Sequence, residues 1–100
     1  MRAFEIRLNG KRLCIAGMEE GMLLCGVACT ENNNRRGDVG LDMTGISYLK
    51  EELVRWKRRT LRTNDVVRVK IIETNKVDKP KLVQKGFPKK KSKQKERRKL

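Results

Sequence analysis

Residues 4–15 read FEIRLNGKRLCI, and this stretch decides the fold of the chain. Asn9-Gly10 at its centre is a preferred pair for a two-residue type I′ turn, because both residues tolerate positive φ. Apolar and polar residues alternate on either side of the pair, as they do in half-buried strands. The stretch therefore predicts a β-hairpin.

A two-residue turn also predicts which residues of the hairpin lie opposite each other. Leu8 faces Lys11, and one side of the ribbon then carries the apolar pairs Ile6–Leu13 and Phe4–Ile15. The other side carries the pairs Arg7–Arg12, Glu5–Cys14 and Ala3–Ala16. One apolar face and one mixed face are typical of a hairpin that covers a core.

Apolar segments downstream of the hairpin predict further strands. After a turn over residues 17–21, the apolar run 22–29 predicts a strand buried on both faces. A helix is the alternative for so short a run, but Gly21 and Gly26 lower helix propensity. The polar residues 31–37 predict a loop, and the alternating residues that follow predict a strand ending near Thr44-Gly45.

The segment 46–60 is ambiguous, because apolar residues recur at helical spacing while Val54 and Trp56 also suit a strand. We expect a turn or short helix near 46–53, then a strand through Trp56. Residues 61–65 predict a turn, and residues 66–72 a strand in which Val67, Val69 and Ile71 share one face. The chain as a whole predicts a mainly β fold, a single antiparallel barrel or sandwich of five or six strands.

Charge divides the chain into two parts. Residues 1–74 contain 14 Lys+Arg and 10 Asp+Glu, whereas residues 75–100 contain 12 and 2. The second part has too few large apolar residues to offset the entropy cost of ordering it, and like charges repel along residues 89–99. We therefore expect a compact β domain over 1–74 and a disordered, Lys-rich tail over 75–100.

Several features indicate a cytoplasmic protein that does not enter membranes. The first residues alternate charged with apolar side chains and lack the apolar stretch of a secretory signal. The apolar run 22–29 is far below the roughly 20 residues that a membrane-spanning helix needs. Cys14, Cys25 and Cys29 are odd in number and irregularly spaced, so we expect small buried side chains and not a disulfide framework.

Short motifs follow one another in a recognisable order: the Asn9-Gly10 hairpin, Cys14-Ile15-Ala16-Gly17, a glycine-bearing apolar strand, Gly40-Leu41-Asp42, Arg55-Trp56, and the stretch 61–69 read as LRTNDVVRV. This order resembles a small bacterial family of uncharacterised proteins of about this length. The resemblance covers roughly residues 3–73 and implies one all-β unit with no known activity. Asn64 stands where the family has glycine, and the basic tail stands where the relatives end in an acidic or neutral extension.

The residue types present exclude many kinds of catalytic site. The chain has no histidine, which excludes Ser-His-Asp and Cys-His nucleophiles and His-containing zinc sites. Cys25 and Cys29 would lie about 13 Å apart on a strand, too far to share a metal. The acidic pairs Glu19-Glu20 and Glu51-Glu52 are expected at the surface. We therefore expect a protein that is not an enzyme and that holds no cofactor or metal.

Two basic segments are candidates for contact with nucleic-acid phosphates. The first surrounds an aromatic residue within the domain, where Trp56 or Tyr48 could stack on bases. The alternative is that Trp56 belongs to the core and the charges form a solvated rim. The candidate residues of this segment are Arg55, Trp56, Lys57, Arg58, Arg59 and Arg62.

The second segment lies in the tail, where closely spaced cations predict salt-sensitive binding with little base selectivity. The alternatives are a solubilising extension or a nuclear-import signal. Its candidate residues are Lys89, Lys90, Lys91, Lys93, Lys95, Arg97, Arg98 and Lys99.

These observations predict a non-catalytic accessory module that contacts RNA or DNA phosphates without sequence specificity, with nucleic acid or a ribonucleoprotein as its partner. The alternative is a protein-interaction or assembly subunit in which the tail is incidental. In that case an exposed apolar patch or an open strand edge would mediate pairing. The sequence does not decide the oligomeric state.

Overall fold

The structure is a computed structural model that describes residues 1–32 and 35–86, and it contains strands and no helix within those ranges. The tail cations from Lys89 to Lys99 lie outside the described residues. The strands are β1 (Arg2–Leu8), β2 (Lys11–Gly17), β3 (Met22–Asn32), β4 (Arg35–Ser47), β5 (Glu52–Leu61), β6 (Val67–Glu73) and β7 (Leu82–Lys85).

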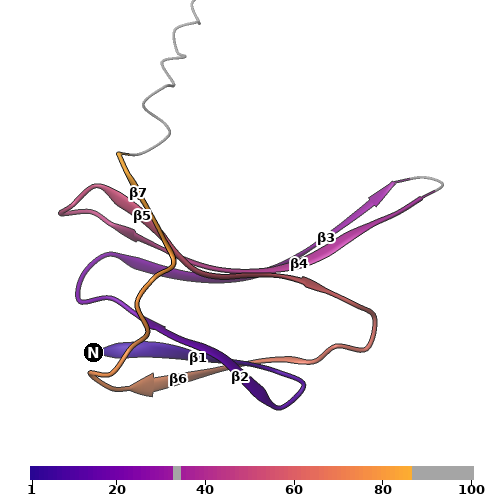
Figure 1. The fold of residues 1–100 in the computed structure, drawn as a ribbon, viewed down its shortest axis with the longest axis horizontal. Helices are drawn as coiled ribbons and strands as arrows, with labels where there is room; N and C mark the ends of the chain where they lie inside the picture. Colours follow the sequence, from indigo (N-terminus) through magenta and orange to yellow (C-terminus); the bar gives the residue numbers. More distant parts are fainter. Residues whose placement is uncertain (33–34, 87–100) are drawn as a thin grey trace, which may run out of the picture.

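The strands form two antiparallel sheets that face each other (Figure 1). Sheet A has the order β2-β1-β6, and sheet B has the order β3-β4-β5-β7. The two sheets do not close into a barrel, and β2 packs against β5 where they meet. The mainly β fold is confirmed, with seven strands in the described chain where the sequence predicted five or six.

The hairpin forms around Asn9-Gly10 as predicted, with φ of 51° at Asn9 and 85° at Gly10. Leu8 lies opposite Lys11 and Arg7 opposite Arg12, also as predicted. Beyond that pair a β-bulge leaves Leu13 without a partner, so the remaining predicted pairs are wrong by one residue. Ile6 faces Cys14, Phe4 faces Ala16, Glu5 faces Ile15 and Ala3 faces Gly17.

The core lies between the sheets. Sheet A contributes Ile6, Leu8, Cys14 and Ala16, and sheet B contributes Leu41, Met43, Val54, Trp56 and Leu61. The bulge turns the small side chains of Cys14 and Ala16 inward where Leu13 and Ile15 were expected. This substitution of small for large side chains leaves room for the indole of Trp56 in the same core.

The second hairpin differs from its prediction in length and in burial. The expected loop over 31–37 is mostly strand, because β3 extends to Asn32 and β4 begins at Arg35. β3 was expected to be buried on both faces, but it is the edge strand of sheet B and is largely exposed. Val27 is 57% exposed and Leu24 is 45% exposed. An apolar run cannot by itself reveal whether a second sheet covers it.

The ambiguous segment 46–60 contains a turn over residues 48–51 and then β5, and the helix expected near 46–53 does not form. Glu51 closes this turn with φ of 52°. Asn64, which stands where the resembling family has glycine, has φ of 77°, in the left-handed region that asparagine tolerates.

Residues 74–81 form a strap that crosses from sheet A to sheet B and leads into β7 (Figure 1). Asp78 donates its backbone N–H to Ile15 and accepts the N–H of Ile15 on its carboxylate, each at 2.8 Å. Trp56 and Arg55 bind the strap from the other sheet. Residues 75–86, which the sequence assigned to the tail, therefore contact both sheets and include β7.

Candidate nucleic-acid interface

The basic segment of β5 is divided between the two faces of sheet B. Lys57 and Arg59 lie opposite the buried residues Met43 and Leu41, on the face turned toward sheet A. Arg58 lies opposite Asp42 and projects from the other face. The sequence placed these cations together, but the pleat of the strand separates them.

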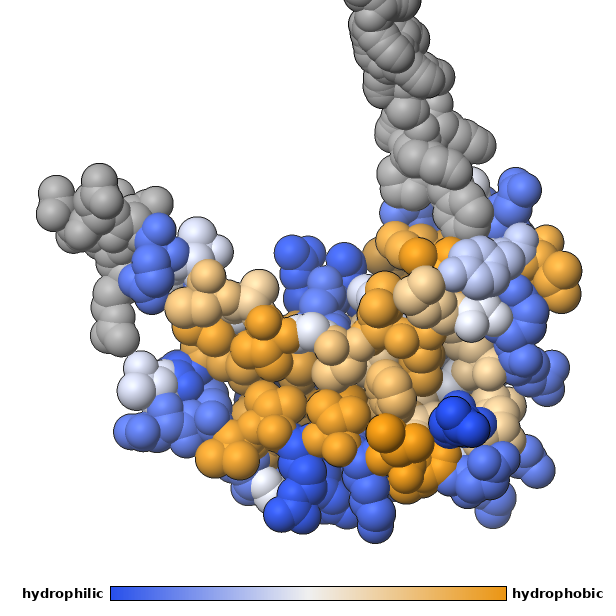
Figure 2. Space-filling view, turned by 180° about the vertical axis from the view of Figure 1, so that it is seen from behind, coloured by the Kyte–Doolittle hydropathy of each residue, from blue (hydrophilic) through white to orange (hydrophobic). Residues whose placement is uncertain are grey.

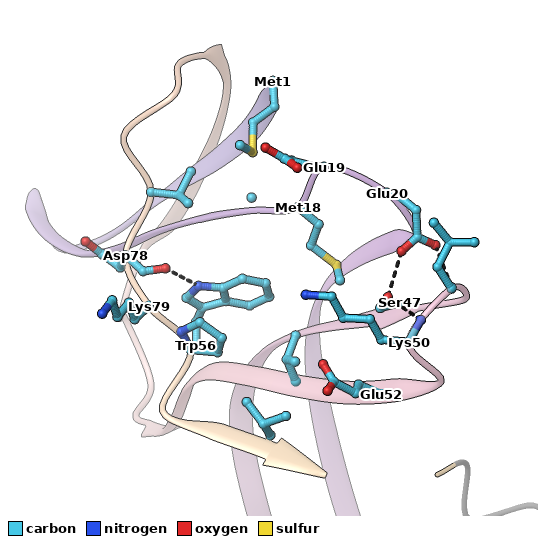
Figure 3. Close-up of a pocket in the computed structure, with 16 residues that line it drawn as sticks. Met1, Met18, Glu19, Glu20, Ser47, Lys50, Glu52, Trp56, Asp78 and Lys79 are labelled. Atoms are coloured by element: carbon cyan, nitrogen blue, oxygen red, sulfur yellow. Dashed lines mark hydrogen bonds between the residues drawn. The ribbon is translucent and has the colours of Figure 1, made fainter. Parts of the chain in front are cut away.

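Two members of the predicted segment have structural partners. Arg55 forms an ion pair with Asp42, with 3.1 Å between Nε and Oδ1. Trp56 is 3% exposed, and its Nε1 donates to the backbone carbonyl of Asp78 at 2.7 Å (Figure 3). The indole therefore lies in the core and presents no face to a base. Tyr48, in the turn before β5, is 54% exposed.

The remaining cations of this segment are Lys57, Arg58, Arg59 and Arg62. None of the four forms an ion pair with the described residues. β7 pairs with β5 only as far as Arg55, so the cations of β5 lie where its edge is unpaired in the described chain. Arg62 follows the strand and is exposed.

A second basic surface, whose residues come from three separate strands, lies on the outer face of sheet A. Arg7 is directly opposite Arg12 on β2 and directly opposite Arg68 on β6. The neighbouring residue Ile6 lies in the core and Val69 is directly opposite Ile6, so the guanidinium groups project from the outer face. We call Arg12, Arg7 and Arg68 the arginine row.

The arginine row brings like charges together without full compensation. Like charges directly opposite each other on adjacent strands destabilise a sheet. Glu5 is the acidic residue on this face. Its Oε2 lies 3.5 Å from Nη2 of Arg7, and Glu5 is directly opposite Lys70 on β6. Arg7 also donates to the carbonyl of Gly10 at 3.0 Å, which fixes its side chain. Arg12, Arg68 and Lys70 are exposed and have no ion pair within the described chain.

The sequence contained the signal for this row in two separate places. The predicted hairpin already paired Arg7 with Arg12, and the predicted strand over 66–72 already placed Arg68 on the face opposite to that of Val67, Val69 and Ile71. The pairing of β1 with β6, which are some 60 residues apart in the chain, brings the two signals together. Figure 2 shows hydrophilic side chains along the margin of the molecule where sheet A lies.

A pocket of about 520 Å³ lies between the strap and the turn 48–51 (Figure 3). Apolar side chains line most of it, including Met18, Val54 and Trp56. Glu19, Glu20, Glu52 and Asp78 also line it, together with Lys50 and Lys79. A cleft with carboxylates and lysines is the arrangement in which catalytic groups would be sought.

Three of these four carboxylates are held by the fold itself. Glu20 accepts hydrogen bonds from the Ser47 hydroxyl at 2.6 Å and from the backbone of Tyr48 and Leu49. Glu52 is ion-paired with Lys85 at 2.8 Å. Asp78 accepts the N–H of Ile15. The hydrogen bond from Ser47, followed by those from Leu49 and Tyr48, lowers the pKa of Glu20.

The three cysteines differ in environment. Cys14 is buried, and burial followed by the charge of Asp78 raises the pKa of its thiol to about 11. Cys25 is half-buried, and burial raises the pKa of its thiol as well. Cys29 is exposed, contrary to expectation, and its Sγ donates to Glu31 at 3.4 Å. Over residues 1–32 and 35–86, no three His, Cys, Asp or Glu side chains group as metal ligands would.

Comparisons with protein-family models, with curated proteins and with solved structures find no match to this chain. No helix among the described residues is long and apolar enough to cross a membrane. The order of motifs in the sequence therefore remains a resemblance, and the surfaces of the molecule are the features that indicate a function.

Proposed function

We propose that this chain is a non-catalytic binding module whose basic surfaces hold the phosphates of RNA or DNA without reading the base sequence. The observation that carries the proposal is the arginine row, in which three guanidinium groups lie opposite one another on adjacent strands. Like-charge repulsion within the row costs stability, and a bound polyanion removes that cost.

Arginine is suited to this task because its planar guanidinium group donates two parallel hydrogen bonds to a phosphate. Adjacent strands lie about 4.8 Å apart, so the row presents donors at regular intervals across sheet A. Lys70, two residues after Arg68 on β6, adds a further cation to the same face. Backbone phosphates can satisfy these donors, and Trp56 takes no part because its ring lies in the core.

The tail adds charge to this surface. Residues 87–100 contain eight Lys+Arg and one Glu, half of the formal net charge of +14. Neutralising phosphates with lysine and arginine releases counterions, which supplies affinity that falls steeply with salt and depends little on sequence. We expect the tail to increase affinity and the arginine row to provide contacts that remain without it.

The test is a titration of the full chain with a generic single-stranded RNA and a generic DNA duplex at low and high salt. We expect binding at low salt that weakens as salt rises. A chain ending at Gly86, which retains all seven strands, should bind more weakly but measurably.

The arginine row is tested in the same titration by the triple variant Arg7→Gln, Arg12→Gln, Arg68→Gln. Its matched control is Lys50→Gln, Lys76→Gln, Lys81→Gln, which removes the same charge from exposed positions off the row. We expect the row variant to lose more affinity than the control. Absence of binding by the full chain at low salt, or equal losses in the two variants, would overturn the proposal.

A further inference from the structure

The four outermost strands of the two sheets are protected to different degrees. β2 carries Lys11 and Arg12, and Asp78 of the strap occupies the middle of its edge. β6 carries Arg68 and Lys70, and β7 is only four residues long and ends in Lys85. Charged side chains, short length and a covering segment are the usual ways in which proteins prevent edge strands from pairing.

β3 lacks these protections over residues 22–30, and its charged side chain, Glu31, lies near the end of the strand. It is 11 residues long and pairs with β4 along one side only. Residues 22–30 contain no charged residue and no proline. Its apolar side chains are exposed on both faces, with Met22, Leu24 and Val27 each more than two-fifths exposed. Figure 2, which is turned by 180° from the view of Figure 1, shows apolar side chains in a broad band across the middle of the molecule.

We propose that β3 pairs with β3 of a second copy of this chain, in antiparallel orientation, so that the two four-stranded sheets become one continuous sheet. A two-fold axis through such an interface brings the same residues together from both copies, so the surface must be complementary to itself. An axis near Gly26 places Leu24 opposite Ala28 and Cys25 opposite Val27, with no charge opposed to a like charge.

The charge distribution favours a second copy over the alternatives. Pairing of β6 with its own copy would bring Arg68 and Lys70 against the same cations, which is unfavourable. Next to the centre of β3, Asp42 is already neutralised by Arg55. β7, which precedes the basic C-terminal residues in the chain, lies at the opposite edge of sheet B, three strands away from β3. The uncharged stretch 22–30 of this edge also offers no side chain that would select an acidic or basic partner.

Gly26 suits the middle of such an interface. A Cβ added there would meet no atom within 4 Å, so the face of sheet B is uncovered beside the proposed axis. The backbone N–H and C=O groups along the free edge of β3 would gain partners on pairing, and Leu24 and Val27 would lose contact with water.

The test is the mass of the full chain by sedimentation equilibrium from micromolar to millimolar concentration, at a salt concentration that screens the tails. We expect a concentration-dependent dimer of the 11.6 kDa chain. Val27→Lys should weaken self-association by about a hundredfold, because each copy loses a buried apolar side chain and gains an unpaired charge. The matched control is Ile71→Lys on β6, where an apolar side chain of similar exposure is replaced, and it should leave the dimer intact.

Circular dichroism establishes that each variant is folded, and Leu24→Lys serves as a second β3 variant if Val27→Lys does not fold. In wild type, amide hydrogen exchange along β3 should slow as concentration rises. A wild-type chain that stays monomeric at every concentration overturns the proposal. So does a dimer that survives both β3 variants, or one that Ile71→Lys disrupts instead.

Discussion

The indole Nε1 of Trp56 donates a hydrogen bond of 2.7 Å to the backbone carbonyl of Asp78. Trp56 lies on β5 in sheet B, and Asp78 is bonded through its backbone and its carboxylate to Ile15 on β2 in sheet A. The two residues therefore join the sheets along one side of the sandwich. They also explain why residues 75–86 fold despite their basic composition, since the strap supplies an acceptor that the buried indole needs.

Replacing Trp56 tests this link. Trp56→Phe removes the N–H donor, leaves the carbonyl of Asp78 without its partner and reduces the volume of the core side chain. We expect the free energy of unfolding to fall by about 2 kcal/mol or more. Urea unfolding followed by circular dichroism measures it, with the exposed Tyr48→Phe as a control that should change stability by less than about 0.5 kcal/mol. Equal stability of the two variants would show that the link contributes little.

The arginine row predicts that a substitution within it raises the stability of the folded protein, whereas most substitutions lower it. Arg68→Gln removes one of three like charges that lie opposite one another, so in the absence of nucleic acid the folded protein should become more stable. The expected gain is about 0.5 kcal/mol at low salt, and it should vanish at high salt because exposed charges are screened. Thermal unfolding at two salt concentrations measures the gain. A loss of stability at low salt would show that Arg68 is not repelled by its neighbours.

The lowered pKa of Glu20 predicts how the stability of the fold depends on pH. Its pKa is lowered in the folded protein by hydrogen bonds from Ser47, Leu49 and Tyr48, relative to an ordinary value of 4.5. A lowered pKa contributes stability above the unfolded value, and this contribution is lost as pH falls through the folded value. Wild type should therefore be more stable than Glu20→Gln at neutral pH, and the difference should shrink below about pH 4.5.

Thermal unfolding between about pH 3 and pH 7 follows this difference. The control is Glu19→Gln, since Glu19 is an exposed neighbour without a hydrogen-bond partner in the described chain. It should leave the pH dependence unchanged. A difference between wild type and Glu20→Gln that is constant across this range would contradict the assignment.

The burial of Cys14 predicts which cysteines react first with alkylating agents. Its pKa of about 11 keeps it protonated, and its burial denies access to the reagent. Iodoacetamide at neutral pH should modify the exposed Cys29 in native protein and leave Cys14 unmodified until denaturant is added. Mass spectrometry of peptides locates the modification. Modification of Cys14 in native protein as fast as in denatured protein would be inconsistent with the described core.

The raised pKa of Cys14 also has a consequence in alkali. A thiol whose folded pKa lies above its unfolded value of 9.0 contributes stability that is fully present below that value and lost as pH rises toward 11. The stability of wild type relative to Cys14→Ala should therefore decline between pH 9 and pH 11.

Local chemistry made part of the fold predictable from sequence. Asn9-Gly10 predicted a turn that needs positive φ, and alternation predicted that Val67, Val69 and Ile71 share one face of their strand. The β-bulge at Leu13 was not predictable, because nothing in residues 11–17 shows that Cys14 and Ala16 must face Trp56. The exposure of β3 was not predictable either, because it depends on the order of the strands in the two sheets.

The candidate site, like the fold, was only partly predictable from the sequence. Clustering along the chain identified the cations of β5, yet the pleat places Arg58 apart from Lys57 and Arg59. The arginine row arises from the pairing of β1 with two different strands, so no single segment displays it. Trp56 could be assigned to the core or to a stacking surface from sequence, and burial places it in the core.

The central claim is that the arginine row contacts phosphates, and the dependence of affinity on salt tests it most directly. The measurement is the slope of log K against log salt concentration for a single-stranded RNA, obtained by fluorescence anisotropy with wild type and the two triple variants. Loss of three phosphate contacts should reduce the magnitude of the slope by about 2 in the row variant, while the control variant should match wild type. A row variant with the slope of wild type, or a control variant with the same reduction, would contradict the claim.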